Sequence, residues 1–268
     1  MTATARISNR IGSHWFCPGE ICLSLACLVV PFGAAHAAFA ADRKPVLVEL
    51  FTSEGCSDCP AADALLARLD STQFVPGAIA IVLSEHVTYW NDLGWKDPFS
   101  SADLTQRQAQ YESRLGLSYV YTPQAVIDGI HQAIGGNVSD LSREIAQAAT
   151  EPKSDLTIEN PHWEGDAVRF SIRADAVPHA TLMAALAEDA TQSAVARGEN
   201  AGRTLHHVAV VCTLQDLGMH ATDGRPLTLK LSTPQEKLTS RTPYRIVVFL
   251  EDTRSGRVLA LAQQSVTR

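Results

Sequence analysis

The sequence has no excess of basic residues, no long apolar run and few aromatic residues. Its 22 Lys and Arg residues are outnumbered by 29 Asp and Glu residues, which gives a formal net charge of −7. A nucleic-acid-binding surface is therefore not expected, and the acidic balance mainly favours solubility. There is also no internal repeat and no low-complexity tract, so the length predicts one large globular domain or two ordinary ones.

The apolar stretch nearest the N-terminus, residues 21–30, is too short to cross a bilayer. Arg6 and Arg10 precede it, and residues 38–40 read Ala-Phe-Ala, which fits a small-x-small cleavage site. This pattern is typical of a secretory signal peptide, so residues 1–40 are expected to be removed. We expect a periplasmic or secreted protein with no stable membrane association after cleavage, and an uncleaved anchor is the alternative.

Cysteine is scarce once the signal peptide is set aside. Cys56, Cys59 and Cys212 remain of the six cysteines. One close pair does not make a disulfide scaffold, and two cysteines fall short of the four ligands of a structural zinc site. Cys212 lies in an alternating apolar pattern, which predicts a small buried side chain rather than a third redox cysteine.

Cys56 and Cys59 stand between a β-branched apolar segment, residues 46–51, and a helical pattern over residues 61–69. A Cys-x-x-Cys at such a junction brings the two sulfurs within bonding reach, and the helix N-terminus favours a thiolate on the first cysteine. We predict a Cys56–Cys59 disulfide that acts as a redox couple, with Cys56 as the exposed attacking sulfur and Cys59 as the buried resolver. A structural staple is the alternative, although so short a loop gains little closure entropy.

Asp63 follows in the same predicted helix. It is either a proton relay for Cys59 or a first-turn carboxylate that complements the helix dipole, and the second interpretation is preferred.

The segment 85–99 follows a second predicted buried strand and is rich in aromatic residues. Site residues of open α/β sheets gather beyond the carboxyl ends of strands, so we predict that His86, Tyr89 and Trp90 contact a substrate. His86 either assists proton transfer or is a hydrogen-bonded loop residue. The aromatic side chains either recognise a partner or form a small satellite core.

A third apolar stretch begins at Thr122-Pro123 and ends at Asp128-Gly129, a hairpin-turn dipeptide. The predicted order of elements is strand, helix, strand, helix, strand, strand, helix. This order, with Cys-x-x-Cys after the first strand and Thr-Pro before the third, resembles the thioredoxin fold over residues 44–150. The resemblance implies a cis proline facing the disulfide, with a substrate chain lying along Thr122 and Pro123.

Beyond residue 152 the pattern changes to short strands separated by turn residues, which predicts a β-sandwich of about seven strands. The expected fold class is therefore an α/β thioredoxin-like N-terminal domain, residues 41–152, followed by a mostly-β, sandwich-like domain, residues 153–268. The predicted strands of the second domain span residues 156–158, 167–172, 182–187, 205–212, 227–231, 244–250 and 258–263.

Two polar groups of the second half have no firm role. His206 and His207 are neighbours in a strand, so they point to opposite faces and cannot jointly bind one metal ion. Glu199, Asn200 and Arg203 lie in a glycine-bracketed loop and form either an interdomain contact or a local turn network.

Five segments together are similar to DUF1223, a family of exported thioredoxin-like proteins. They read FTSEGCSDCP at residues 51–60, HVTYW at 86–90, LGWKD at 93–97, YTPQ at 121–124 and GENAGR at 198–203.

The leading functional hypothesis is an exported thiol–disulfide oxidoreductase that exchanges with a protein or a small thiol or disulfide. It needs no cofactor and no metal. One alternative is a metallochaperone that binds Cu(I) through Cys56 and Cys59, with His86 as a third ligand, although the sequence lacks a Met-rich tract. The other is a non-catalytic binding protein of the cell envelope.

Overall fold

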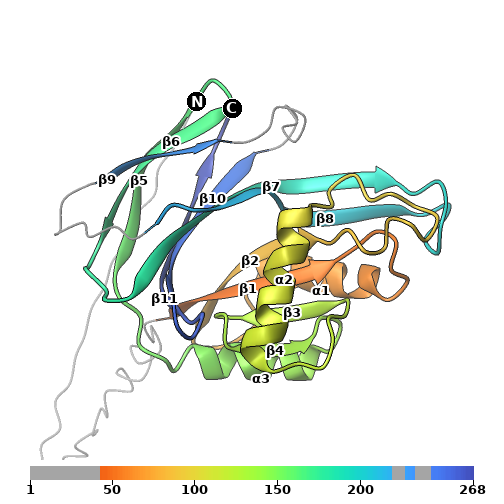
Figure 1. Cartoon of the computed structure of the whole chain (residues 1–268), viewed down its shortest axis with the longest axis horizontal. Coiled ribbons are helices and arrows are strands. Elements are labelled where there is room, and N and C mark those ends of the chain that lie inside the picture. The colour runs from red at the N-terminus through yellow and green to blue at the C-terminus, as the bar shows by residue number, and fades with distance from the viewer. Residues whose placement is uncertain (1–42, 219–226, 233–242) are drawn as a thin grey trace, which may run out of the picture. The chain divides into compact units, whose positions relative to one another are not determined.

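One large mixed sheet organises the protein, as the computed structural model shows (Figure 1). The structure describes residues 43–218, 227–232 and 243–268, so the predicted signal peptide lies outside the described residues. The first half contains β1 (Lys44–Thr52), α1 (Cys59–Thr72), β2 (Ala78–His86), α2 (Ala102–Leu115), β3 (Gln124–Ile127), β4 (His131–Ile134) and α3 (Val138–Ala148). The predicted element order of this half is confirmed.

The second half is built from strands, as predicted. They are β5 (Leu156–Glu164), β6 (Ala167–Ala174), β7 (Ala180–Ala194), β8 (Thr204–Asp216), β9 (Leu227–Ser232), β10 (Tyr244–Asp252) and β11 (Val258–Val266). Each predicted strand corresponds to one of these. None of the helices in the described ranges has the length and hydrophobicity needed to cross a membrane.

The predicted fold class is wrong, because no separate α/β thioredoxin-like domain precedes a separate β domain. In the described part of the chain, one eight-stranded sheet has the order β11-β10-β7-β8-β2-β1-β3-β4. Strand β8 pairs with β2 in parallel, with Ser84 opposite Val210, and this pairing makes the two halves one sheet. Sequence alternation revealed each strand but not this pairing, since it joins segments far apart in the chain.

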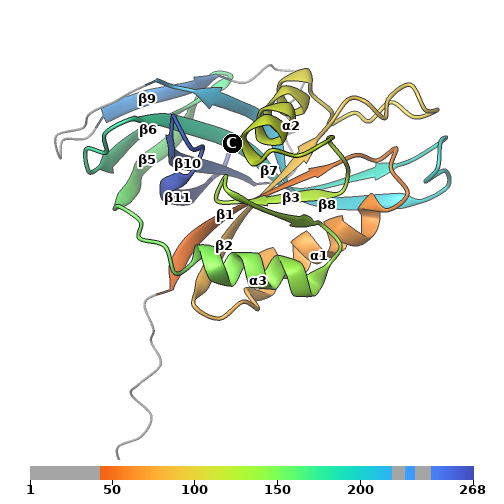
Figure 2. The same ribbon diagram turned by 60° about the horizontal axis from the view of Figure 1, so that its bottom comes forward.

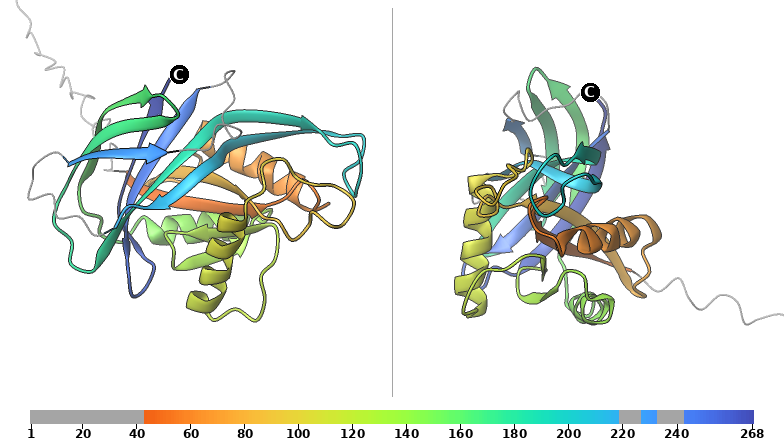
Figure 3. Two further views of the ribbon diagram at one scale, coloured as in Figure 1. Left: turned by 45° about the horizontal axis from the view of Figure 1, so that its top comes forward. Right: turned by 90° about the vertical axis from the view of Figure 1, so that its right-hand side faces the viewer.

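The second sheet, β5-β6-β9, gives the second half its sandwich-like packing (Figure 3). Apolar residues of β6 such as Phe170 and Ile172 share one buried cluster with Leu182 of β7 and Val248 of β10. The alternation of inward apolar and outward polar residues explains why these strands cover one another.

Helices cover both faces of the large sheet around β1 and β3. Helices α1 and α3 lie on one face and α2 on the other (Figure 2). Helix α2 begins at the predicted cap, Ser101, whose side chain accepts a hydrogen bond from the Asp103 amide. Gly116 in the left-handed conformation ends this helix, because a residue without Cβ adopts positive φ at little cost.

The β3–β4 turn also ties the halves together. Asp128 and Gly129 both have positive φ, as the Asp-Gly hairpin signal predicts. A Cβ at Gly129 would lie 1.9 Å from the carbonyl oxygen of Gly256, in the β10–β11 turn. The Asp128 carbonyl accepts the Val258 amide at 3.0 Å, so only glycine permits this close approach.

A buried ionic cluster holds α2 against the sheet. Arg107 contacts Glu49 of β1 at 2.5 Å and Glu251 of β10 at 3.1 Å. Tyr111 donates a hydrogen bond to Glu49 at 2.5 Å, and Arg114 contacts Glu251 at 2.6 Å. The helix of the first half is therefore anchored to a strand of the second half by charges that are only satisfied together.

Glu85 lies against this cluster, and the pH dependence of stability tests whether it is protonated there. Glu85 is fully buried. Burial raises its pKa well above the ordinary value of 4.5, and the neighbouring charge of Glu49 raises it further. Because the folded state retains this proton longer than the unfolded state, Glu85 lowers stability progressively as pH rises above about 4.5. Glu85→Gln should therefore match the wild type at pH 4 and become more stable than it toward pH 8.

Urea unfolding at several pH values measures this difference. The exposed Asp166→Asn variant is the control and should follow the wild type throughout. Parallel stability profiles for Glu85→Gln and the wild type would show that Glu85 is not protonated in the fold.

Candidate functional site

The predicted disulfide joins Cys56 and Cys59, whose Cα atoms are 5.4 Å apart. Cys59 is the first residue of α1, and the chain turns into the helix through Asp58 at the N-cap. Pro60 fits the first helical turn because that position needs no amide donor. The Cys59 amide donates to the Cys56 carbonyl at 3.3 Å, so the turn that closes the disulfide is also the start of the helix.

The expected exposure of Cys56 is wrong. Only 1% of Cys56 and 0% of Cys59 is accessible to solvent. The two residues between them, Ser57 and Asp58, are exposed. The disulfide therefore lies directly beneath the surface, under a cover supplied by other segments.

Trp90 is one part of that cover. Its Cβ lies 3.0 Å from the position that a Cβ on Gly55 would occupy, so Gly55 admits the indole where a side chain would force it away. The Trp90 Nε1 donates to Thr122 Oγ1 at 2.8 Å. The Thr122–Pro123 peptide is cis, as the resemblance implied. Trp90 thus joins the residue before Cys56 to the residue before Pro123.

The connection between β7 and β8, residues 195–203, is the other part, and we call it the strap. The buried Asn200 side chain donates from Nδ2 to the carbonyl oxygens of Glu54 and Cys56, both at 2.9 Å. Glu199 accepts the Ser57 amide at 3.1 Å. Figure 3 shows the β7–β8 hairpin reaching the loops after β1 and β2. The loop forms both a local turn network, in which Arg203 donates to Asn200 Oδ1 at 2.8 Å, and a contact with a distant segment of the chain.

A buried histidine lies behind the disulfide segment. His207 Nε2 is 3.3 Å from Glu54 Oε1, and His207 Nδ1 is 3.4 Å from Asp63 Oδ2. The other oxygen of Asp63 accepts the Thr52 hydroxyl at 2.9 Å. The other oxygen of Glu54 accepts the Trp95 indole at 2.7 Å. His207 therefore connects the segment before Cys56 with the helix that begins at Cys59.

Burial alone would lower the pKa of His207, but hydrogen bonds and charge interactions with Asp63 and Glu54 outweigh it and raise the pKa to about 9. The imidazole is therefore protonated at neutral pH. Its ring also lies 4.7 Å, centroid to centroid, from that of His86. The sequence assigned His207 no site, and for Asp63 it left open a proton relay for Cys59 or a dipole role, with the dipole role preferred. Strand alternation does mark His207 as inward-facing, but nothing local identifies its partners.

The other predicted site residues separate into two groups. Tyr89 is 38% exposed and Trp90 half-buried, next to Thr122. His86 is fully buried, and its Nδ1 contacts Asp97 Oδ2 at 2.7 Å. Burial would raise the pKa of Asp97, but His86 and backbone amides lower it overall. Trp90 contacts Thr122 and lies against Gly55 of the disulfide segment, whereas His86 lies next to His207.

The described residues contain no group of three or more His, Cys, Asp or Glu side chains that could hold a metal ion. Cys212 is buried, as predicted.

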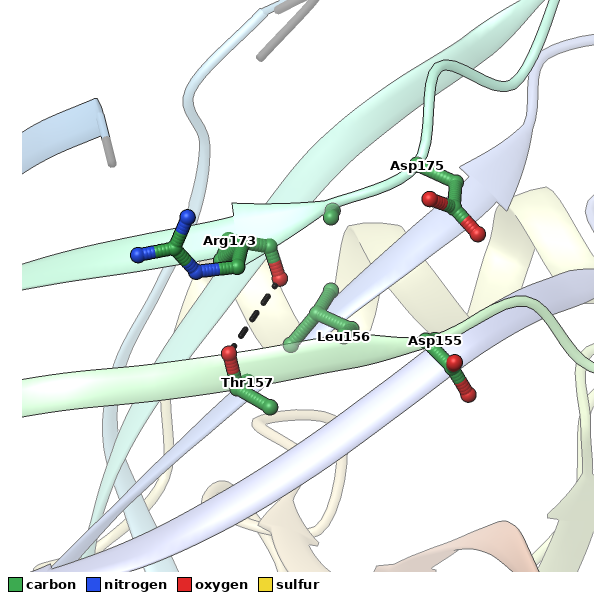
Figure 4. Close-up of a pocket in the computed structure, with 6 residues that line it drawn as sticks. Asp155, Leu156, Thr157, Arg173 and Asp175 are labelled. Atoms are coloured by element: carbon green, nitrogen blue, oxygen red, sulfur yellow. Dashed lines mark hydrogen bonds between the residues drawn. The ribbon is translucent and has the colours of Figure 1, made fainter. Parts of the chain in front are cut away.

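A recess of about 340 Å³ lies elsewhere, where β5 begins and β6 ends (Figure 4). The Thr157 hydroxyl and the Arg173 carbonyl, 3.5 Å apart, face one another at its wall. Its lining residues are Asp155, Leu156, Thr157, Arg173, Ala174 and Asp175. None of them belongs to the predicted site.

The fold and site define a mostly-β protein whose Cys-x-x-Cys disulfide starts a helix and lies under a strap from a distant hairpin. The chain belongs to the family described as "Protein of unknown function (DUF1223)", whose family model matches residues 47–251.

A crystal structure of an Agrobacterium tumefaciens protein, solved by a structural genomics consortium, is similar. It is 26% identical to this chain and has a TM-score of 0.61. The match covers 84% of this chain and 95% of the Agrobacterium protein. A match to Bacteroides uniformis β-glucuronidase 2, at 10% identity and a TM-score of 0.18, covers 43% of this chain and 13% of the enzyme, and carries no argument. A comparison with curated proteins found no match.

The charge on His207 should appear in the pH dependence of stability. Its pKa rises from 6.5 in the unfolded chain to about 9 in the fold, so its contribution is complete below pH 6.5 and is lost as pH rises through about 9. That shift corresponds to up to about 3 kcal/mol. His207→Gln should be destabilised most at pH 6, and its difference from the wild type should shrink by pH 9.5.

Denaturant unfolding of the oxidised protein measures this difference. His206→Gln alters the exposed neighbour on the opposite face and should show no such trend. A His207→Gln penalty that stays constant from pH 6 to pH 9.5 would mean that the imidazole is neutral.

Proposed function

We propose that the protein is a thiol–disulfide oxidoreductase whose working couple is Cys56–Cys59. The observation that carries the proposal is the position of the disulfide at the N-terminus of α1, bounded on the outside by exposed Ser57 and Asp58. A disulfide that closes so short a loop contributes little to folding through chain entropy. The helix N-terminus stabilises a thiolate that forms there.

The proposed exchange proceeds in two steps. A partner thiolate attacks Cys56 Sγ, the Cys56–Cys59 bond breaks, and its electron pair stays on Cys59 Sγ. A second thiolate then attacks the partner sulfur of the mixed disulfide and releases Cys56. The reverse sequence reduces a partner disulfide. Thiols and disulfides supply all the electrons, so the exchange needs no cofactor.

Access to Cys56 requires the cover to move. The strap is held to the disulfide segment by hydrogen bonds from Asn200 and to Glu199. Trp90 is held by one hydrogen bond to Thr122 and by packing against the apolar cluster that contains Phe51. A partner chain that takes over contacts with Thr122 and Pro123 would displace Trp90, whose indole uses the Thr122 hydroxyl. Tyr89 is exposed beside Trp90 and is the proposed contact for the partner.

We further propose that the protein works after export, in the periplasm or outside the cell. The signal-peptide pattern of residues 1–40 supports this location, and oxidising compartments maintain a disulfide of this kind. The Cu(I) alternative lacks a third ligand, because no group of three or more His, Cys, Asp or Glu side chains in the described residues is placed to hold a metal ion. A non-catalytic binding role is tested by the experiment that follows.

Trapping of a mixed disulfide at Cys56 tests the proposal directly. In a Cys212→Ala background, reduced Cys59→Ser protein should react with glutathione disulfide to give a stable mixed disulfide at Cys56, because no resolving thiol remains. With both cysteines present, the same reaction should proceed to the Cys56–Cys59 disulfide and release two glutathione molecules. Mass spectrometry of the intact protein distinguishes these products.

Cys56→Ser is the matched control and should form the adduct at least about tenfold more slowly, since the proposal assigns the attack to Cys56 and the resolving step to Cys59. Equal trapping by the two variants would contradict the roles assigned to Cys56 and Cys59. If neither variant reacted, the oxidoreductase proposal would be wrong.

A variant with a weakened strap tests whether the strap protects the disulfide. Asn200→Ala removes both side-chain hydrogen bonds from the strap to the Glu54 and Cys56 carbonyls. Dithiothreitol should then reduce the disulfide several-fold faster, because the attacked sulfur is reached without first breaking those bonds. Rates are measured by alkylating released thiols.

Asn137→Ala separates local opening from general destabilisation. Asn137 caps α3 and accepts the Asp140 amide at 3.1 Å, so its removal costs about 1 kcal/mol and leaves the strap intact. If both variants react equally fast, the strap does not protect the disulfide.

A further inference from the structure

Opening the disulfide leaves a negative charge on a buried sulfur. Cys59 leaves as a thiolate, and no part of Cys59 is accessible to solvent. An unpaired anion in such a site is costly. It also favours the return attack of Cys59 on the mixed disulfide. A nearby proton donor would remove both obstacles.

Helix geometry places a buried carboxyl group on the same face of α1 as Cys59. Asp63 lies four residues after Cys59 in α1, so the two side chains share a face and Asp63 leans toward the helix N-terminus. Asp63 Oδ2 and His207 Nδ1 form a buried ion pair, 3.4 Å apart, and neither atom makes a hydrogen bond of better geometry in the described structure. Two polar atoms that face one another in this way are placed to exchange a proton.

The opposite side of the imidazole is also fixed. His207 Nε2 faces Glu54 Oε1 at 3.3 Å, and Glu54 lies two residues before Cys56. A single imidazole from β8 therefore touches the segments on both sides of the Cys-x-x-Cys. A side chain needed only for packing would not require two carboxylate partners in the interior.

We propose that His207 is a positioning residue that, through Asp63, supplies the proton taken up by Cys59 when the disulfide opens. This inference rests on the proposed redox role of Cys56 and Cys59. The partner thiolate forms the new S–S bond with Cys56, and the electron pair of the broken bond remains on Cys59 Sγ. The Asp63 carboxylate takes a proton from His207 Nδ1 and passes it to that sulfur. The result is a neutral imidazole, which regains its proton from water, and a Cys59 thiol.

The titratable groups that face His207 come from three other elements. They are Glu54 after β1, Asp63 in α1 and His86 at the end of β2, which is itself bound to Asp97. The two carboxylates favour the protonated imidazole, and its pKa of about 9 is consistent with a donor that is loaded at neutral pH. The His207 imidazole should lose its proton only above that pH.

The test is the rate of disulfide reduction by dithiothreitol from pH 6.5 to pH 10, divided by the fraction of dithiothreitol present as thiolate. His207→Gln should be at least about tenfold slower than the wild type at pH 7. The two rates should converge above pH 9, where the wild-type imidazole has also lost its proton. His206→Gln should match the wild type at every pH.

Asp63→Asn is the second variant. It should be slow across the whole range, because the path from His207 to Cys59 is interrupted whether or not the imidazole is charged. A His207→Gln rate that equals or exceeds the wild type at pH 7, or that is reduced by the same factor at all pH values, would overturn the proposal, since loss of structural support alone would make the disulfide easier to reach.

The wild type alone gives a check that does not depend on any variant folding. Its normalised rate should fall above pH 9, and a flat profile would overturn the proposal. Dithiothreitol reduction reports the chemistry of the protein's own disulfide. A failed glutathione trap with a convergent pH profile would therefore reject the proposed function alone, and the opposite pair of results would reject only the His207 relay.

Discussion

The contact of His207 with Glu54 and Asp63 is the interaction on which the arrangement of the site depends. It joins β8 to the loop after β1 and to α1, three elements from two distant parts of the chain. A buried carboxylate without a partner is strongly disfavoured, and two are worse. The imidazolium between them therefore fixes where α1 begins relative to β8, and with it the position of the Cys-x-x-Cys turn beneath the strap.

The opposite face of the sheet follows the same principle. Glu49 and Glu251 are brought together on Arg107 of α2, so a strand of the second half completes the charge balance of a helix in the first. With the β2–β8 pairing and the contact of Gly129 with Gly256, these interactions leave neither half with a complete interior of its own. The absence of a separate N-terminal domain is a consequence of this sharing.

The strap gives the second half a role that its strands alone do not suggest. Asn200 binds the carbonyl of Cys56 itself, and Glu199 occupies the Ser57 amide beside the helix N-terminus. Those amides are the groups that would stabilise a thiolate on Cys56. Movement of the strap would therefore expose the sulfur and release an amide donor beside it at the same time. The strap therefore contacts both the Cys56 carbonyl and an amide beside the helix N-terminus.

The sequence by itself determined the features that depend on nearby residues. Cys56 and Cys59 are three positions apart, so their spacing at a strand–helix junction was enough to predict the disulfide. The Ser101 cap and the Asp128-Gly129 turn are likewise local, and apolar alternation marked the strands of the second half. A resemblance carried by short motifs supplied the cis peptide before Pro123.

Only the tertiary structure decided the exposure of Cys56 and the partners of Asp63 and His207. Asn200 and Cys56 are 144 residues apart, and His207 and Glu54 are 153 residues apart. No periodicity or spacing rule spans such distances, because burial and charge pairing are set by which elements finally pack together. The sequence shows which side chains are capable of the chemistry, whereas the fold decides which of them meet.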